Sequence, residues 1–167
     1  MRGKGWAIGA AVSVILAGAA GATDLSGLGL GVGTFVGNEH MDQIFGRLAF
    51  HIALDKRWTL GAELKGGVYE SYSYHRLYAG LDARYYFAPR RTRAVQGYGG
   101  LAVGVTKEVS FGRDHANYLY VRPALGADFP IRGTALSPYI DVAYQHIFTG
   151  DPIIGATGEV GLRFDLW

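Results

Sequence analysis

The stretch Ile44-Phe-Gly-Arg-Leu-Ala-Phe-His-Ile-Ala-Leu54 decides the fold, because its side chains alternate in character from one residue to the next. Large apolar residues share one parity: Ile44, Leu48, Phe50, Ile52 and Leu54. Polar and small residues share the other: Arg47, Ala49, His51 and Ala53. Successive side chains of a β-strand point to opposite faces, so this period of two predicts an extended strand with one apolar face.

The same alternation recurs along the chain and predicts eight strands. We expect them at residues 27–37, 43–54, 57–69, 75–87, 95–106, 117–129, 135–148 and 155–167. Each segment reaches the roughly 9–11 residues that a tilted strand needs to cross a membrane. The fold class is therefore all-β, an eight-stranded antiparallel up-and-down transmembrane β-barrel. Pro123 lies inside the sixth strand, where it removes a ladder hydrogen bond, so a bulge or local distortion is expected there.

The charge count of the two faces predicts which face lies inside the barrel. A soluble barrel would turn its apolar face inward. Here the apolar parity holds two ionisable residues, His75 and His146, both near one rim. The other parity holds six basic and six acidic residues: Arg47, Glu63, Lys65, Arg76, Asp82, Arg84, Arg122, Asp128, Asp141, Glu159, Arg163 and Asp165. Because an unpaired buried charge is costly, this balance is typical of a narrow interior, and we expect an interior charge network facing a filled lumen.

Aromatic residues near the strand ends predict two girdles at the membrane boundaries, where amphipathic rings are favoured. The residues assigned to them are Trp58, Tyr69, Tyr85, Phe87, Tyr118, Tyr120, Tyr139, Phe148 and Trp167. The connections near residues 55–56, 88–94 and 130–134 are expected on the periplasmic side. The remaining connections are expected outside the cell.

The first 22 residues have the pattern of a secretory signal peptide, which leaves 23–167 as the outer-membrane barrel domain. Arg2 and Lys4 precede an apolar run from Trp6 to Leu16, and Ala20-Gly-Ala22 fits a cleavage site. Removing Arg2 and Lys4 leaves 14 of the 16 basic residues against 14 acidic ones, so the domain is formally neutral. A neutral domain disfavours a nucleic-acid partner. The expected location is the outer membrane of a Gram-negative cell envelope, after export.

From these residues the chain resembles the eight-stranded outer-membrane barrels, such as the OmpA transmembrane domain and OmpX-like proteins. The resemblance covers the region after the signal peptide and includes the C-terminal segment Glu159-Val-Gly-Leu-Arg-Phe-Asp-Leu-Trp167. It implies insertion by the barrel-assembly machinery and contact with outer-membrane lipid and lipopolysaccharide. It also implies a structural or interaction role in the envelope, without a large pore. An alternative role is that of a barrel subunit in a larger envelope complex with a protein partner.

A weaker similarity to the PagL-type lipid A deacylases gives a second alternative, a lipid-A-modifying ester hydrolase. In that family a His lies near the outer end of the seventh strand, with a Ser two residues later and a Glu on the eighth strand. His146 and Glu159 match two of these positions, whereas position 148 is Phe and Thr149 is the nearest hydroxyl. Glu159 also falls on the inward parity, so no catalytic residue is assigned beyond this alternative.

No cofactor is expected, because the glycine-rich run 27–33 alternates as a strand without a following helix. Glu39, His40 and Asp42, or Asp114 with His115, supply metal-ligand chemistry without a metal motif, so no metal site is expected. Arg90, Arg91 and Arg93 form a basic turn that suits anionic phospholipid headgroups.

Overall fold

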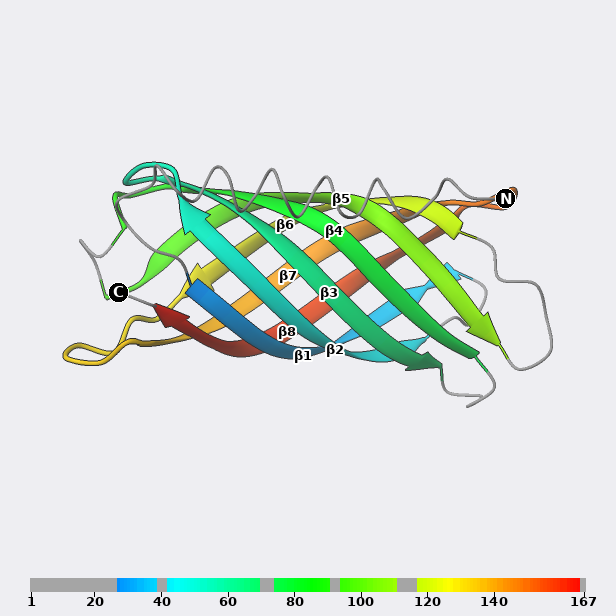
Figure 1. Ribbon diagram of the computed structural model, residues 1–167, viewed down its shortest axis with the longest axis horizontal. Helices are drawn as coiled ribbons and strands as arrows, with labels where there is room; N and C mark the ends of the chain where they lie inside the picture. Colours follow the sequence, from blue (N-terminus) through cyan, green and yellow to red (C-terminus); the bar gives the residue numbers. More distant parts are fainter. Residues whose placement is uncertain (1–26, 39–41, 70–73, 91–93, 111–116, 166–167) are drawn as a thin grey trace, which may run out of the picture.

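The computed structural model describes residues 27–38, 42–69, 74–90, 94–110 and 117–165. It is a closed antiparallel barrel in which each strand pairs with its neighbour in the chain and β1 also pairs with β8 (Figure 1). The strands are β1 (Gly27–Gly37), β2 (Gln43–Ala53), β3 (Trp58–Tyr69), β4 (Tyr74–Tyr86), β5 (Gln96–Ser110), β6 (Asn117–Asp128), β7 (Leu136–Phe148) and β8 (Ile153–Asp165). The predicted eight-stranded up-and-down barrel is confirmed. Within the described ranges, no helix is long and apolar enough to cross a membrane.

Two strands, β5 and β8, differ from the predicted bounds by more than one residue. β5 continues to Ser110 instead of ending at residue 106. Lys107 and Glu108, which were expected in a connection, stay in register with β4, opposite Leu77 and Arg76. β8 begins at Ile153 and its described part ends at Asp165.

Pro123 interrupts the sheet without changing its register. Pairing between β6 and β7 is present on both sides, at Val121 opposite His146 and at Ala124 opposite Ala143, with the same offset. The predicted local distortion is therefore confirmed, whereas a bulge is not, because a bulge would shift the register by one residue. The Pro123 side chain is exposed on the outside of the barrel.

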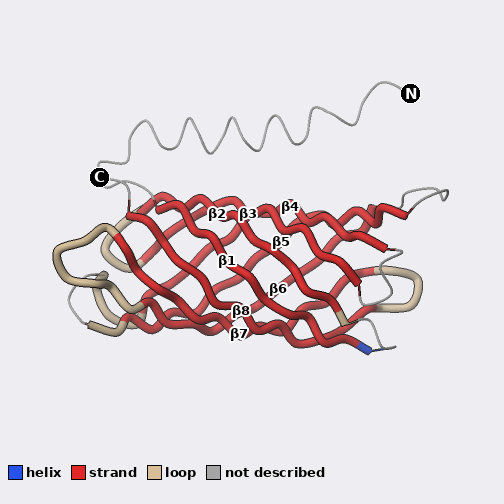
Figure 2. Tube along the Cα trace, turned by 90° about the horizontal axis from the view of Figure 1, so that it is seen from below, coloured by secondary structure: helices blue, strands red, loops and turns tan. Residues whose placement is uncertain are grey.

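We call the end of the barrel with the connections 54–57, 87–95 and 129–135 the inner end, and the opposite end the outer end (Figure 2). Side-chain and glycine chemistry fix two of the inner turns. In the first, Asp55 Oδ1 accepts the backbone N–H groups of Arg57 and Trp58 at 2.6 and 2.7 Å. These bonds favour the ionised carboxylate and lower the pKa of Asp55. In the third, Gly133 has a φ of 79°, which favours glycine.

The two faces of the sheet differ in the polarity of their side chains. Side chains that point outward form the outer wall, where large apolar residues are exposed on every strand, with Leu64 57% and Leu125 59% exposed. Side chains that point inward fill the lumen, where Arg47, Glu63 and Arg122 are almost completely buried. The polar face therefore lies inside, as the charge count predicts.

Glycines on the inward face make room for aromatic rings. A Cβ at Gly161 would lie 2.7 Å from the ring of Tyr139, and it would overlap the carbonyl oxygen of Leu30. A Cβ at Gly31 would overlap the hydroxyl of the same tyrosine. Two further tyrosines are seated in the same way, Tyr120 against Gly80 and Gly104, and Tyr98 against Gly126. An eight-stranded lumen is only wide enough for side chains to fill, so each large ring requires a missing side chain elsewhere.

This packing predicts opposite outcomes for two glycines on β8. Gly161→Ala should destabilise the barrel by about 1–3 kcal/mol, because the new methyl group meets backbone that cannot yield. Gly158→Ala is the matched control, since its Cβ points outward and meets nothing within 4 Å. Urea unfolding in lipid vesicles measures both variants. Equal stability of the two would contradict the packing argument.

Candidate functional site

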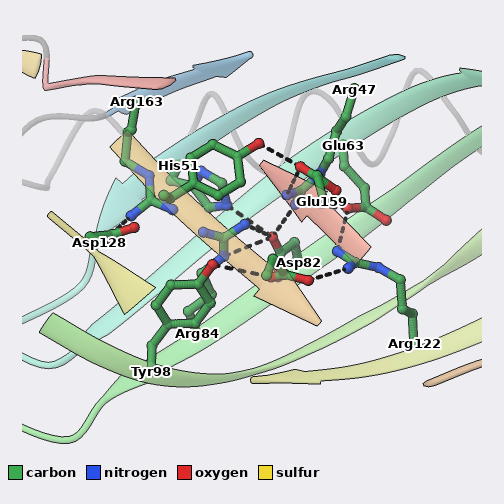
Figure 3. A network of polar contacts seen from close by, with 12 residues as sticks. Arg47, His51, Glu63, Asp82, Arg84, Tyr98, Arg122, Asp128, Glu159 and Arg163 are labelled. Carbon is green, nitrogen blue, oxygen red and sulfur yellow. Dashed lines mark hydrogen bonds and ion pairs between the residues drawn. The ribbon is translucent and has the colours of Figure 1, made fainter. Parts of the chain in front are cut away.

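The lumen holds a network of buried ion pairs whose centre is Asp82 on β4 (Figure 3). Arg47 Nη2 lies 2.6 Å from Asp82 Oδ2, and Arg84 reaches the same oxygen through Nε at 3.0 Å and Nη2 at 2.9 Å. His51 Nε2 is a further neighbour at 3.0 Å. One carboxylate thus interacts with three side chains from β2 and β4.

Arg47 on β2 connects this centre to β3 and β8. Its guanidinium lies 2.8 Å from Glu63 Oε2 on β3 and 3.1 Å from Glu159 Oε1 on β8. Arg47 therefore contacts three carboxylates, which offsets the cost of burying its own charge. Glu159 also accepts a hydrogen bond from the Tyr139 hydroxyl at 2.5 Å.

Arg122 extends the network to β6 and β7. It lies 3.1 Å from Glu63 Oε2 and 2.9 Å from Asp141 Oδ1. A tyrosine hydroxyl donates a further hydrogen bond to each of these carboxylates. Tyr120 donates to Glu63 at 2.8 Å, and Tyr98 donates to Asp141 at 3.1 Å. Charge-assisted bonds of this kind are stronger than neutral ones, so the lumen is rigidly cross-linked.

A second cluster lies toward the inner end. Asp128 forms an ion pair with Arg163 and accepts a hydrogen bond from the Tyr86 hydroxyl at 2.8 Å. The guanidinium of Arg163 also lies 5.8 Å from the ring centre of Tyr98 and 5.6 Å from that of Tyr139. Such cation–π contacts stabilise the charge where carboxylates do not reach.

The outer part of the lumen holds an apolar cluster beside buried polar side chains such as Arg76 and Gln43. The buried residues of this cluster come from seven strands: Phe35, Phe45, Tyr78, Ala102, Tyr120, Ile147 and Ile153. Phe35 and Ile147 lie near the ends of β1 and β7, and Ile153 begins β8, so this apolar plug lies on the outer side of the ion network. Lys65 packs beside it, with Nζ 5.1 Å from the ring centre of Phe45 and 3.8 Å from Glu63.

The structure places eleven of the twelve residues of the expected charge network in the buried lumen. Asp165 is half-buried at the inner end and pairs with Arg90 at 3.5 Å. Glu108, which the sequence analysis left in a connection, also points inward and lies 3.5 Å from Arg76. Among the described strand residues, six cations and seven carboxylates therefore face inward, with Glu108 and Asp165 at opposite ends of the barrel. His51 was also missing from the expected network, although it shares the parity of Arg47 and that parity could have identified it.

The girdle assignment requires corrections. Tyr120 and Tyr139 are buried in the lumen, because they share the inward parity of Arg122 and Asp141, and placement near a strand end was the wrong criterion. Tyr118 is half-buried and packs against the apolar plug. Four members do lie on the outer wall near strand ends: Trp58, Tyr85, Phe87 and Phe148. The side chain of Tyr69 and all of Trp167 lie outside the described part.

The three residues of the hydrolase alternative do not converge. His146 lies on the outer wall and stacks on Phe148, with ring centres 4.4 Å apart. Glu159 lies inside the lumen, bound to Arg47 and Tyr139. Thr149 follows β7, and its hydroxyl donates to the carbonyl oxygen of Asp151. The barrel wall separates the histidine from the carboxylate, so no nucleophile, base and acid form a triad here.

The other candidate ligands are only partly described. Glu39, His40, Asp114 and His115 lie outside the described residues, as do Arg91 and Arg93 of the basic turn. Among the residues that the structure places, no group of three or more His, Asp or Glu could hold a metal ion. Arg90 lies at the inner rim, where its backbone N–H donates to the Lys56 carbonyl oxygen at 2.8 Å.

Comparison with known proteins identifies the fold. No family model matches the chain, and no curated protein sequence matches it. Among solved structures, Neisserial surface protein A matches with a TM-score of 0.68 and 10% identity, over 84% of this chain and 96% of that one. This chain has the fold of the small outer-membrane barrels.

Two further structures support that conclusion. The outer membrane protein OprG of Pseudomonas aeruginosa matches with a TM-score of 0.57 and 14% identity, over 86% of this chain and 95% of that one. The outer membrane enzyme PagL matches with a TM-score of 0.55 and 13% identity, over 83% of this chain and 99% of that one. At such identities the likeness shows the fold alone.

The ion network predicts a large loss of stability when the charge of its central carboxylate is removed. Asp82→Asn should destabilise the barrel by about 3–5 kcal/mol, because Arg47 and Arg84 would lose their shared buried counter-ion. Asp165→Asn, at the half-buried inner rim, should cost less than about 1 kcal/mol. Urea unfolding in lipid vesicles measures the loss of stability in both variants. A loss at Asp82 no larger than that at Asp165 would show that the network does not stabilise the fold.

Proposed function

We propose that the protein is an integral outer-membrane barrel with a structural or interaction role in the cell envelope and without a large pore. The observation that carries this proposal is the contrast between an apolar outer wall and an ionic, filled lumen. In this proposal the signal peptide directs export, the barrel-assembly machinery inserts the domain, and the inner end faces the periplasm.

The outer wall suits hydrocarbon better than water. Its exposed apolar residues come from all eight strands and surround the barrel. Soluble monomers rarely expose a contiguous apolar patch larger than a few hundred Å². A closed barrel also satisfies its backbone hydrogen bonds internally, which is the condition for strands to span a bilayer.

The filled lumen disfavours a pore function. Six cations and seven carboxylates on the described strands face inward, and aromatic rings occupy the space above inward glycines. The apolar plug at the outer side adds a second barrier to ions. The connections are also short, the longest being residues 87–95, so any interaction would use the outer wall and the rims.

The lipid-A hydrolase is the less supported alternative. The likeness to PagL is a likeness of fold, and it gives no support for a shared active site. Glu159 already interacts with Arg47 and Tyr139 inside the lumen, where a lipid ester in the surrounding membrane cannot reach it.

Charge on the outer wall gives a direct test of membrane insertion. Leu64 lies near the middle of β3 and is 57% exposed, so Leu64→Arg would cost little in water. In a bilayer the same change should cost about 2–4 kcal/mol, because arginine would face the hydrocarbon midplane. Leu54→Arg, in the inner connection 54–57, should cost only about 0–1 kcal/mol. Vesicle unfolding distinguishes the two, and equal costs would overturn the proposal.

Planar-bilayer recording tests the absence of a large pore. We expect the purified barrel to give no stable, large single-channel current, because charged side chains and rings fill its lumen. Sucrose-gradient fractionation of expressing cells should place the same protein with the outer membrane. A large stable current, or recovery as a freely soluble protein, would refute the corresponding part of the proposal.

A further inference from the structure

The outer wall has a groove across β1 to β6 that the proposed function does not use. It is lined by two adjacent rows of register partners. One row is Leu30, Leu48, Leu64, Ala79 and Val105. The other contains Gly46, Gly66, Leu77, Lys107 and Asn117. The strands cross the barrel obliquely (Figures 1 and 2). Rows of register partners run across the strands, so the groove that they line is also oblique.

A pair of glycines forms the floor of the groove. Gly46 and Gly66 are register partners on β2 and β3, and both face outward. A Cβ at Gly46 would meet nothing within 4 Å. Leu48 and Leu64 flank the pair on one side, and Ile44 and Val68 flank it on the other. The two missing side chains therefore leave an apolar depression in an otherwise leucine-rich wall.

One end of the groove carries a positive charge. Lys107 lies near the outer end of β5, is exposed, and points outward. It is the one permanently charged side chain among the outward-facing strand positions that the structure describes, and no carboxylate lies on the same described face. Its neighbour Glu108 points inward to Arg76. A lysine on this wall has a cost in lipid, so an anionic partner at the membrane surface would account for its position.

We propose that this groove binds one molecule of lipopolysaccharide through its lipid A part. A phosphate of lipid A lies at Lys107, with Asn117 beside it, and an acyl chain follows the groove over Gly46 and Gly66 toward Leu30. The assignment to the outer leaflet follows from the outer position of Lys107 on β5. The inference rests on the proposed membrane location, and it adds a specific lipid site to it.

Binding of purified, doubly phosphorylated lipid A to the barrel in dodecyl maltoside, followed by native mass spectrometry, tests this site. We expect one bound lipid A per barrel. Lys107→Ala should weaken binding about fivefold, the effect of losing one lysine near an anionic lipid surface, whereas Lys107→Arg should retain it. Gly46→Leu should weaken binding severalfold, because its side chain fills the depression.

Gly158→Leu is the matched control, because Gly158 also faces outward with nothing within 4 Å of its Cβ, but it lies on β8 away from the groove. Circular dichroism and thermal unfolding verify that every variant is folded. The site is refuted if lipid A does not bind, if Lys107→Ala and Gly46→Leu bind like the parent, or if Gly158→Leu weakens binding equally. Equal affinity for phosphatidylglycerol would show that the groove does not select lipid A, and this would refute the assignment of lipid A as its ligand.

The fractionation experiment separates the two proposals. A protein that is found in the outer membrane but does not bind lipid A keeps the proposed function and loses this site. A protein that is absent from the membrane loses both. The same mass spectra would also show whether a bound lipid A loses an acyl chain, which would contradict simple binding and favour the hydrolase.

Discussion

The closure of eight strands is the constraint on which the rest of the structure depends. A barrel of this size has a lumen that side chains must fill, and its inward positions are set by the two-residue period of each strand. Large inward side chains therefore require small ones opposite them, as Tyr139 requires Gly31 and Gly161. Inward charges require partners, as Arg47 requires its three carboxylates.

These two requirements divide the lumen into zones. Tyrosines link the zones because each has an apolar ring and a polar hydroxyl. Tyr120 belongs to the apolar plug through its ring, yet its hydroxyl donates to Glu63 in the ion network. Tyr98 likewise lies under the guanidinium of Arg84 while its hydroxyl donates to Asp141. The lumen is thus continuous in packing although its chemistry changes from one end to the other.

Local pattern was sufficient to predict the strands and their faces, because each residue's parity already determines whether it points inward. The girdle errors arose where nearness to strand ends replaced parity, at Tyr120 and Tyr139. The fifth strand was ended too early, at residue 106, which left Lys107 and Glu108 in a connection. Which cation meets which carboxylate could not be predicted, since Arg47 and Glu159 are 112 residues apart and their contact depends on the stagger of all eight strands. The glycine pair of the groove depends on the register of β2 against β3 in the same way.

The contact between Arg47 and Glu159 also bears on how the barrel forms. The two residues belong to β2 and β8, the strands on either side of β1. Glu159 therefore lies on the last strand to be synthesised. Until β8 arrives, Arg47 lacks one of its three counter-ions and the sheet has two open edges. An incomplete sheet would thus enter lipid with part of its charge uncompensated. We therefore expect membrane insertion to be coupled to the pairing of β8 with β1, because an open sheet edge leaves backbone groups unsatisfied in hydrocarbon.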